Sequence, residues 1–166
     1  MIIQIDSREK NNKEITRYFD LIGQKYFVSK LYAGDYCNPQ NQSIVVELKK
    51  DLVELANNLG KEHDRFRREI LRASDMGAKM VILIREPGLK TIEDVFSWRS
   101  PINFSTKKPR TTVKGSTLAK QMITMEKKYG VKFKFCSRID AGREILKILG
   151  GKDETITLKE SIDADL

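Results

Sequence analysis

Five consecutive apolar residues, Met80 to Ile84, constrain the fold more than any other feature of the chain. The run is short for a helix, and it lacks the polar residues that a solvent-facing side of a strand would carry. It therefore predicts a strand that is buried on both faces. Such a strand needs helices on each side of its sheet. Amphipathic patterns supply them at residues 15–22, 52–59, 66–76, 91–98, 118–129 and 141–149.

Further strand candidates complete the pattern, at residues 1–5, 26–31, 43–48 and 131–135. Residues 38–42 are rich in turn formers, so they predict a hairpin between the strands at 26–31 and 43–48. The alternation of strands and helices predicts an α/β sandwich with a central mixed sheet flanked by helices. We expect one domain over residues 1–150. Residues 151–166 carry two basic and five acidic residues, and we expect a weakly ordered tail there.

The charge of the chain favours a polyanionic partner. Its 31 Lys and Arg residues outnumber 23 Asp and Glu residues, which gives a net charge of +8. The excess lies at residues 105–135, where there are nine basic residues and one acidic residue. Residues 105–116 predict a flexible loop that grips phosphates, although a solvated surface also explains its charge. The loop's candidate phosphate contacts are Lys107, Lys108, Arg110 and Lys114.

A second basic cluster falls on the expected helix at 66–76. Arg65, Arg68 and Arg72 have the spacing of one helix face. That face either lies beside a catalytic edge or is simply solvated, and the spacing does not decide between the two.

Composition also excludes several site classes. The chain has two cysteines and one histidine, so it cannot build a four-thiolate zinc site or a multi-histidine metal site. Few cysteines favour a reducing compartment, and we expect a cytoplasmic protein. No apolar run approaches 18 residues, so we expect no membrane partner.

A carboxylate and lysine pattern carries the most specific chemistry. Glu47 and Lys49 are two residues apart on an expected strand and project from one face, and a hairpin can bring Asp35 beside them. Asp6, at the end of the first strand, would add a third carboxylate. Carboxylate oxygens suit Mg²⁺, which keeps waters and binds substrate phosphates. The spacing alone also fits an ordinary solvent-facing strand followed by a turn.

Four motifs in order resemble the nuclease domain of the XPF/Mus81 structure-specific endonucleases. They are Ile5-Asp6-Ser7-Arg8-Glu9, Gly34-Asp35-Tyr36, Val45-Val46-Glu47-Leu48-Lys49 and Arg65-Phe66-Arg67-Arg68-Glu69. The resemblance implies a restriction-endonuclease-like three-layer sandwich with a PD-(D/E)XK site that uses Mg²⁺ or Mn²⁺ to cut branched or flapped DNA. It places metal ligands at Asp35 and Glu47, the motif lysine at Lys49, and the family's acidic and basic pair at Asp6 and Arg8, which we expect to act as an accessory metal ligand and a phosphate contact.

Two departures from the family pattern keep other functions open. The family's Glu-Arg-Lys is here Glu47-Leu48-Lys49, and Val53 stands where the family usually has an aspartate. A nuclease fold that binds DNA or RNA without cutting is therefore one alternative, and a basic RNA-binding or DNA-packaging protein is another. With 166 residues, we expect neither the family's helicase region nor its tandem helix-hairpin-helix region. It resembles a minimal version of the type carried by phages and mobile elements, with a homodimer or a further DNA-binding protein as a possible partner.

Overall fold

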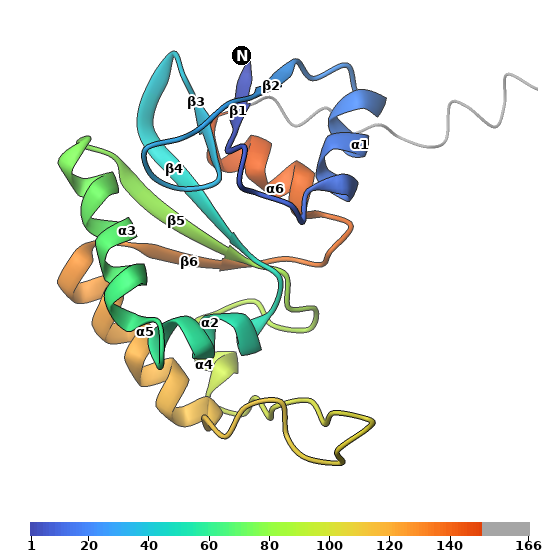
Figure 1. Ribbon diagram of the computed structural model, residues 1–166, viewed down its shortest axis with the longest axis vertical. Coiled ribbons are helices and arrows are strands. Elements are labelled where there is room, and N and C mark those ends of the chain that lie inside the picture. The colour runs from blue at the N-terminus through green and yellow to red at the C-terminus, as the bar shows by residue number, and fades with distance from the viewer. Residues whose placement is uncertain (151–166) are drawn as a thin grey trace, which may run out of the picture.

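The computed structural model describes residues 1–150 and shows one mixed sheet in that part of the chain (Figure 1). Its strands are β1 (Ile3–Ile5), β2 (Tyr26–Val28), β3 (Tyr36–Asn38), β4 (Asn41–Lys49), β5 (Lys79–Ile84) and β6 (Lys132–Phe135). The order across the sheet is β2-β1-β3-β4-β5-β6. Strand β3 runs antiparallel to β1 and β4, whereas the other neighbouring strands pair in parallel.

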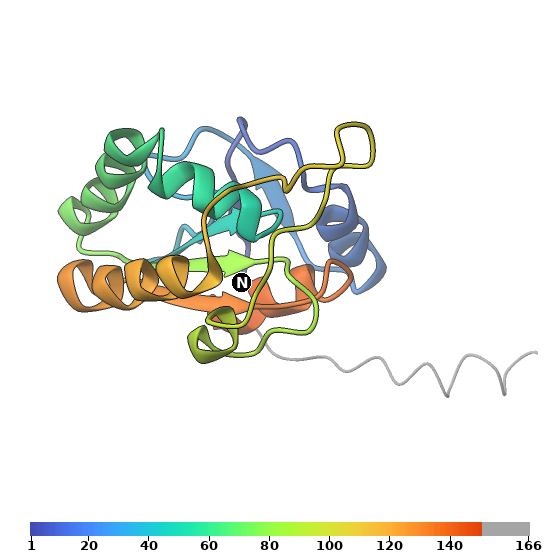
Figure 2. The same ribbon diagram turned by 90° about the horizontal axis from the view of Figure 1, so that it is seen from below.

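Helices cover both faces of the sheet, which gives three layers (Figures 1 and 2). The first face carries α2 (Leu52–Leu59), α3 (His63–Asp75) and α5 (Gly115–Tyr129), and the short α4 (Ile92–Val95) packs beside α5. The second face carries α1 (Lys13–Leu21) and α6 (Ala141–Ile148), which pack on each other. The predicted three-layer α/β sandwich is confirmed.

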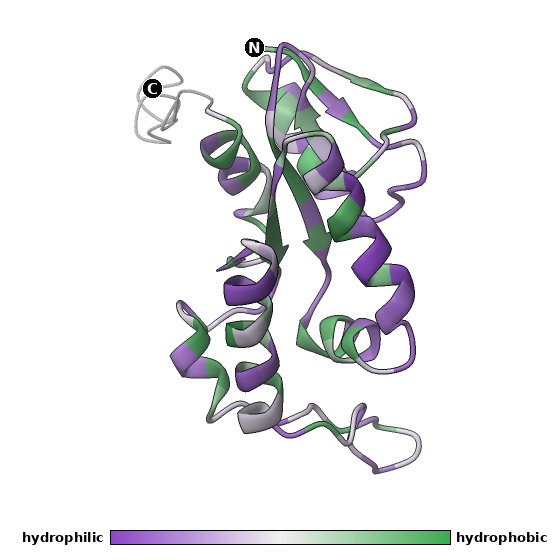
Figure 3. Cartoon of the chain, turned by 90° about the vertical axis from the view of Figure 1, so that its left-hand side faces the viewer, coloured by the Kyte–Doolittle hydropathy of each residue, from purple (hydrophilic) through white to green (hydrophobic). Residues whose placement is uncertain are grey.

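Strand β5 has the double burial that its sequence predicts. Ile82 and Ile84 pack in the core under α2, α3 and α5, and Leu83 packs in the core under α1 and α6. All three side chains are fully buried. Figure 3 shows the hydrophobic strands enclosed between helices whose outer faces are hydrophilic.

The hairpin joins different strands from those predicted. Strand β4 pairs with the short strand β3, whereas β2 lies at the sheet edge and pairs with β1. The expected pairing of residues 26–31 with 43–48 is therefore wrong. The physical reason is that β3 comprises only three residues directly before the turn, and so short a segment carries little strand signal of its own.

Gly34 forms the tight approach between the start of β3 and β4. It has a φ of +75°, which favours glycine, and a Cβ atom there would come within 3.1 Å of the Cβ atom of Val45 and of the Val46 carbonyl oxygen. A side chain at this position would push the following residue, Asp35, away from the end of β4.

The segment between α4 and α5 is irregular, as predicted, but it is internally hydrogen-bonded. The Asn103 N–H donates to the Lys108 carbonyl over 2.8 Å, and the Lys107 N–H donates to the Asn103 carbonyl, also over 2.8 Å. An isolated β-bridge joins Ile102 to Pro109. The loop projects beyond α2 and α4 (Figure 1).

The tail expected at residues 151–166 lies outside the residues that the structure describes. Within residues 1–150, no helix has the length and apolarity to cross a membrane.

Candidate active site

A cleft of about 610 Å³ contains the predicted carboxylates and lysine. Glu47 and Lys49 lie near the end of β4, and their side chains line the cleft. The side chain of Leu48, the residue between them in sequence, points to the other face of the sheet and packs in the core there. Asp35 lies directly before β3 and joins them, because Tyr36 pairs with Val46 across the hairpin. The fold therefore brings together the three residues that the sequence pattern singles out.

Hydrogen bonds at its backbone and side chain fix the position of Asp35. The Asp35 N–H donates to the Val46 carbonyl over 2.8 Å, and the Asp35 carbonyl accepts from the Asp6 N–H at 2.8 Å. Its carboxylate oxygen Oδ2 accepts from the Leu48 N–H at 2.8 Å. One oxygen of the carboxylate is thus committed to the backbone of β4, which holds the group rigidly at the cleft.

Lys49 and Glu47 form a buried ion pair. The Lys49 Nζ lies 2.7 Å from Oε1 of Glu47, and the exposed fractions of the two side chains are 6% and 13%. The same ammonium lies 4.8 Å from the ring centroid of Phe66, on α3. Packing against the ring and pairing with the carboxylate together orient the ammonium within the cleft.

Burial in the cleft raises the pKa values of its two central carboxyl groups. Burial, with the charges of Glu47 and Glu9, raises the pKa of Asp35 well above its ordinary value. Burial also raises the pKa of Glu47, although Lys49 opposes that shift. For Lys49, burial lowers the pKa, but Glu47, Glu54 and Asp35 together outweigh it and the pKa is raised. The lysine is therefore charged at neutral pH.

The predicted accessory acid, Asp6, already has partners. Its Oδ2 accepts from Nε of Arg8 at 2.8 Å, and its Oδ1 accepts from the Leu31 N–H at 2.9 Å. Arg8 also donates to the Leu31 carbonyl over 3.1 Å. A cation on Asp6 would compete with these hydrogen bonds, and its role as a metal ligand stays a prediction.

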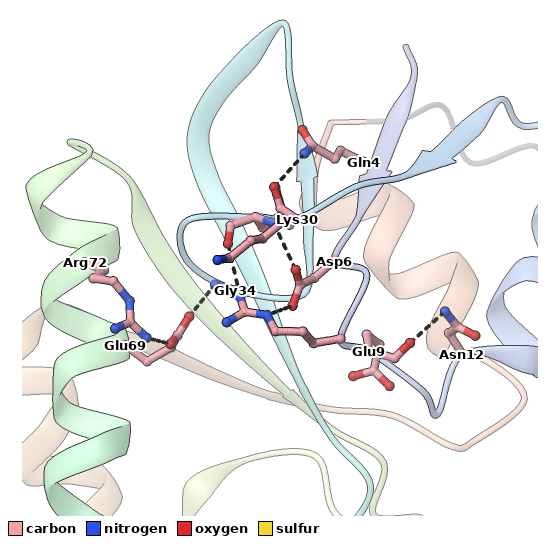
Figure 4. Close-up of polar contacts among 10 residues, drawn as sticks. Gln4, Asp6, Glu9, Asn12, Lys30, Gly34, Glu69 and Arg72 are labelled. Atoms are coloured by element: carbon pink, nitrogen blue, oxygen red, sulfur yellow. Dashed lines mark hydrogen bonds and ion pairs between the residues drawn. The ribbon is translucent and has the colours of Figure 1, made fainter.

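Glu69 ends the fourth motif of the sequence, and the structure gives it a role at the site that the sequence analysis did not assign. From α3 it accepts a hydrogen bond from the Gly34 N–H at 3.0 Å, and it pairs with Arg72 one turn further along the helix. Figure 4 shows Glu69 and Arg72 on one side of Gly34 and Asp6 on the other. Glu69 therefore connects α3 to the turn that presents Asp35.

Three further carboxylates line the cleft, Glu9, Glu54 and Glu62. Burial raises the pKa of Glu9, against the effect of its hydrogen bond from the Asn11 backbone. Glu54 accepts from the Lys50 N–H at 2.7 Å, and Asp51 caps α2 by accepting from the Glu54 N–H at 2.8 Å. Glu54 adds negative charge close to the position where the departure at Val53 removes it.

Comparison with family models decides the family. The ERCC4 domain model matches residues 5–149, almost all of the described chain. The chain belongs to the ERCC4 domain family. The resemblance to the XPF-type nuclease domain is thereby confirmed. No curated protein sequence matches this ERCC4 domain significantly.

Solved structures show the same fold. XPF from Aeropyrum pernix is similar with a TM-score of 0.65 at 17% identity, over 99% of this chain and 70% of that one. A second structure, XPF from Aeropyrum pernix in complex with DNA, is similar with a TM-score of 0.63 at 17% identity, over 89% of this chain and 62% of that one. The ERCC4 domain described here thus spans about two thirds of each matched chain.

The departure at Leu48 does not alter the cleft side of β4. All three residues from Glu47 to Lys49 line the cleft, but the Leu48 side chain is 5% exposed and packs in the core under α1 and α6, while its backbone N–H donates to Asp35. Replacement of the family's arginine therefore changes the core of this ERCC4 domain and leaves the two charged neighbours in place.

The predicted cationic contacts divide into two groups. Arg8, Arg65 and Arg72 line the cleft, whereas Arg68 is exposed on α3 and does not line it. The loop cations Lys107, Lys108, Arg110 and Lys114 also lie away from the cleft lining and are exposed. The loop nevertheless contacts the start of α2 through an ion pair, because Arg110 lies 3.5 Å from Asp51, which caps the helix that carries the cleft residue Glu54.

The donor set of this ERCC4 domain suits a divalent cation shared with a substrate. Within residues 1–150, no group of three or more acidic, histidine or cysteine side chains is arranged so that it could hold a metal ion by itself. Mg²⁺ is typically held by one or two carboxylates, with waters and substrate phosphates completing its shell. Asp35 and Glu47 fit that role because both are half-buried carboxylates that line the cleft side by side.

Proposed function

We propose that this ERCC4 domain is a divalent-metal-dependent endonuclease that hydrolyses phosphodiester bonds in branched or flapped DNA. One observation carries the proposal: the ion pair of Glu47 and Lys49, 2.7 Å apart and largely excluded from solvent, lies beside the half-buried carboxylate of Asp35 in an open cleft. Burying charged groups costs desolvation free energy, and a role in function explains why the fold keeps these groups despite that cost. The family and the DNA complex of an XPF structure support DNA as the substrate.

Asp35 and Glu47 would hold the cation. When bound, a divalent cation supplies a water of lowered pKa and neutralises charge on the phosphate. Asp35 presents its carboxylate from a turn fixed by the backbone of β4, and Glu47 presents its carboxylate from β4 itself. We assign Asp6 mainly to holding Arg8 at the entrance of the cleft, where the guanidinium would contact a phosphate.

Lys49 acts in its charged form. Because its pKa is raised, the Lys49 side chain stays protonated at neutral pH and does not act as a general base. It would instead donate a hydrogen bond that orients the attacking water or stabilises charge developing on the phosphate. Glu47 and the ring of Phe66 fix the direction of that hydrogen bond.

Cleavage of a labelled DNA fork in Mg²⁺ tests the proposal. Asp35→Asn keeps an acceptor for the Leu48 N–H but removes a ligand charge, so we expect cleavage to be lost while fork binding persists. Asp75→Asn, an exposed position on the last turn of α3, is the matched control and should cut normally. Cleavage by Asp35→Asn at the rate of the control would disprove the assigned site.

A further inference from the structure

The loop between α4 and α5 ends in apolar side chains that the protein leaves in solvent. Phe104 is 90% exposed and Ile102 is 60% exposed. Phe104 has the highest exposed fraction among the large hydrophobic residues that the structure describes. An exposed aromatic side chain at the tip of a projecting loop forms no part of the core, so its position needs another explanation.

The loop holds this tip in a defined shape. The Arg110 N–H donates to the Pro101 carbonyl over 2.8 Å, which closes the base of the loop. Near the tip, the Asn103 side chain accepts from the N–H groups of Ser105 and Thr106, at 2.9 and 3.2 Å. The backbone around Phe104 is therefore ordered before any partner binds, which reduces the entropy lost on binding.

Cations surround the apolar tip. The Lys107 Nζ lies 5.9 Å from the ring centroid of Phe104, and Lys108 is exposed beside it. An apolar protein partner would leave these ammonium groups without counter-charges. A nucleotide satisfies both features, since its base offers a flat apolar face and its phosphate offers a negative charge.

The loop is attached to the edge of the cleft. Arg110 lies 3.5 Å from Asp51, the N-cap of α2, and Asp51 follows Lys49 by two residues. Figure 2 shows the loop crossing in front of α2 and extending toward the side of the molecule that carries α1. A DNA strand leaving the cleft along α2 would meet the loop.

We propose that Phe104 stacks on an unpaired base of the substrate while Lys107 and Lys108 contact the flanking phosphates. This inference rests on the proposed nuclease function and narrows it to DNA in which single-stranded bases adjoin the cut site. Base stacking on an aromatic side chain tolerates any sequence, because each base has a π-face. The loop would therefore select the structure of the DNA and not its sequence.

Binding measured in EDTA tests the proposal independently of cleavage. The probes are a fluorescent fork with single-stranded arms and a fully paired duplex of equal length. Stacking on one base predicts that Phe104→Ala weakens fork binding by about 5- to 150-fold and barely changes duplex binding. Phe104→Trp should restore fork affinity, and its indole fluorescence should be quenched on the fork but not on the duplex.

Two variants separate stacking from other causes. Phe96→Ala removes another exposed phenylalanine, at the end of α4 outside the loop, and should bind the fork as the wild type does. Phe104→Leu keeps an apolar side chain without a flat ring and should behave like Phe104→Ala. Equal losses on fork and duplex, wild-type binding by Phe104→Leu or a changed oligomeric state in Phe104→Ala would overturn the proposal. Failure of the wild type to bind either DNA would instead overturn the proposed nuclease function.

Discussion

The ammonium of Lys49 lies 2.7 Å from Oε1 of Glu47, and both side chains are almost excluded from solvent. A buried ion pair of this kind rarely increases stability over an apolar pair, because desolvation offsets the attraction. Removing only one partner, by contrast, leaves an uncompensated buried charge. The pair therefore makes a prediction about stability that is separate from catalysis.

The effects of substitutions at Lys49 and Glu47 on the free energy of unfolding should not be additive. We expect Lys49→Met to lower the free energy of unfolding by about 3–5 kcal/mol, because Glu47 then loses its counter-charge. Glu47→Gln in the same chain should recover much of that loss. Urea denaturation of the four proteins measures the coupling. Strictly additive effects would show that the two side chains do not interact in solution.

Asp35 should destabilise the metal-free fold at neutral pH. Its folded pKa is raised, so the folded state prefers the protonated acid, and stability falls as pH rises from the ordinary carboxyl range through the raised pKa. Asp35→Asn should therefore be more stable than the wild type at pH 7, by about 0.5–2 kcal/mol, with the difference vanishing in acid. Thermal melts across pH in EDTA test this prediction, and a difference that grows toward acid would contradict it.

Divalent cations should make the wild type more stable than Asp35→Asn. A ligand that binds only the folded state raises the melting temperature, so Mg²⁺ or Mn²⁺ should stabilise the wild type. Asp35→Asn should show little response, and Asp75→Asn should respond as the wild type does. Equal stabilisation of all three proteins would place the cation elsewhere.

Glu69 should act as a positioning residue. Glu69→Gln keeps an acceptor for the Gly34 N–H, whereas Glu69→Ala removes it. We expect Glu69→Ala to require more Mg²⁺ for half-maximal cleavage, because the turn carrying Asp35 loses its contact with α3, and Glu69→Gln to remain near the wild type. If both variants change the Mg²⁺ requirement equally, the ion pair with Arg72 matters and the Gly34 contact does not.

The loop cations should set part of the salt dependence of DNA binding. Neutralising Lys107, Lys108 and Lys114 leaves Arg110 paired with Asp51. If each lysine contacts a phosphate, the slope of log affinity against log salt should decrease in magnitude by about 2–3 on duplex or single-stranded DNA. Fluorescence anisotropy at several salt concentrations measures it. An unchanged slope would favour the cleft arginines Arg65 and Arg72 as the principal phosphate contacts.

The pattern of apolar and polar residues along the sequence predicted the strands whose side chains alternate or are buried on both faces. The apolar run of β5 identified a doubly buried strand, and the period of two in β4 placed Glu47 and Lys49 together. The hairpin partner was missed because β3 is three residues long. Glu69 was quoted in the fourth motif, but its role was missed because its contact joins a side chain to a backbone N–H 35 residues away. No periodicity in the sequence records such a contact.

Cleavage of a fork by the wild type, with and without divalent cation, tests the central claim most directly. The account predicts no product in EDTA, cleavage when Mg²⁺ or Mn²⁺ is added, and loss of that cleavage in Glu47→Gln despite retained fork binding. Product formation in EDTA would contradict the proposed metal dependence. An intact fork that the wild type binds but does not cut with either cation would identify a DNA-binding domain without nuclease activity.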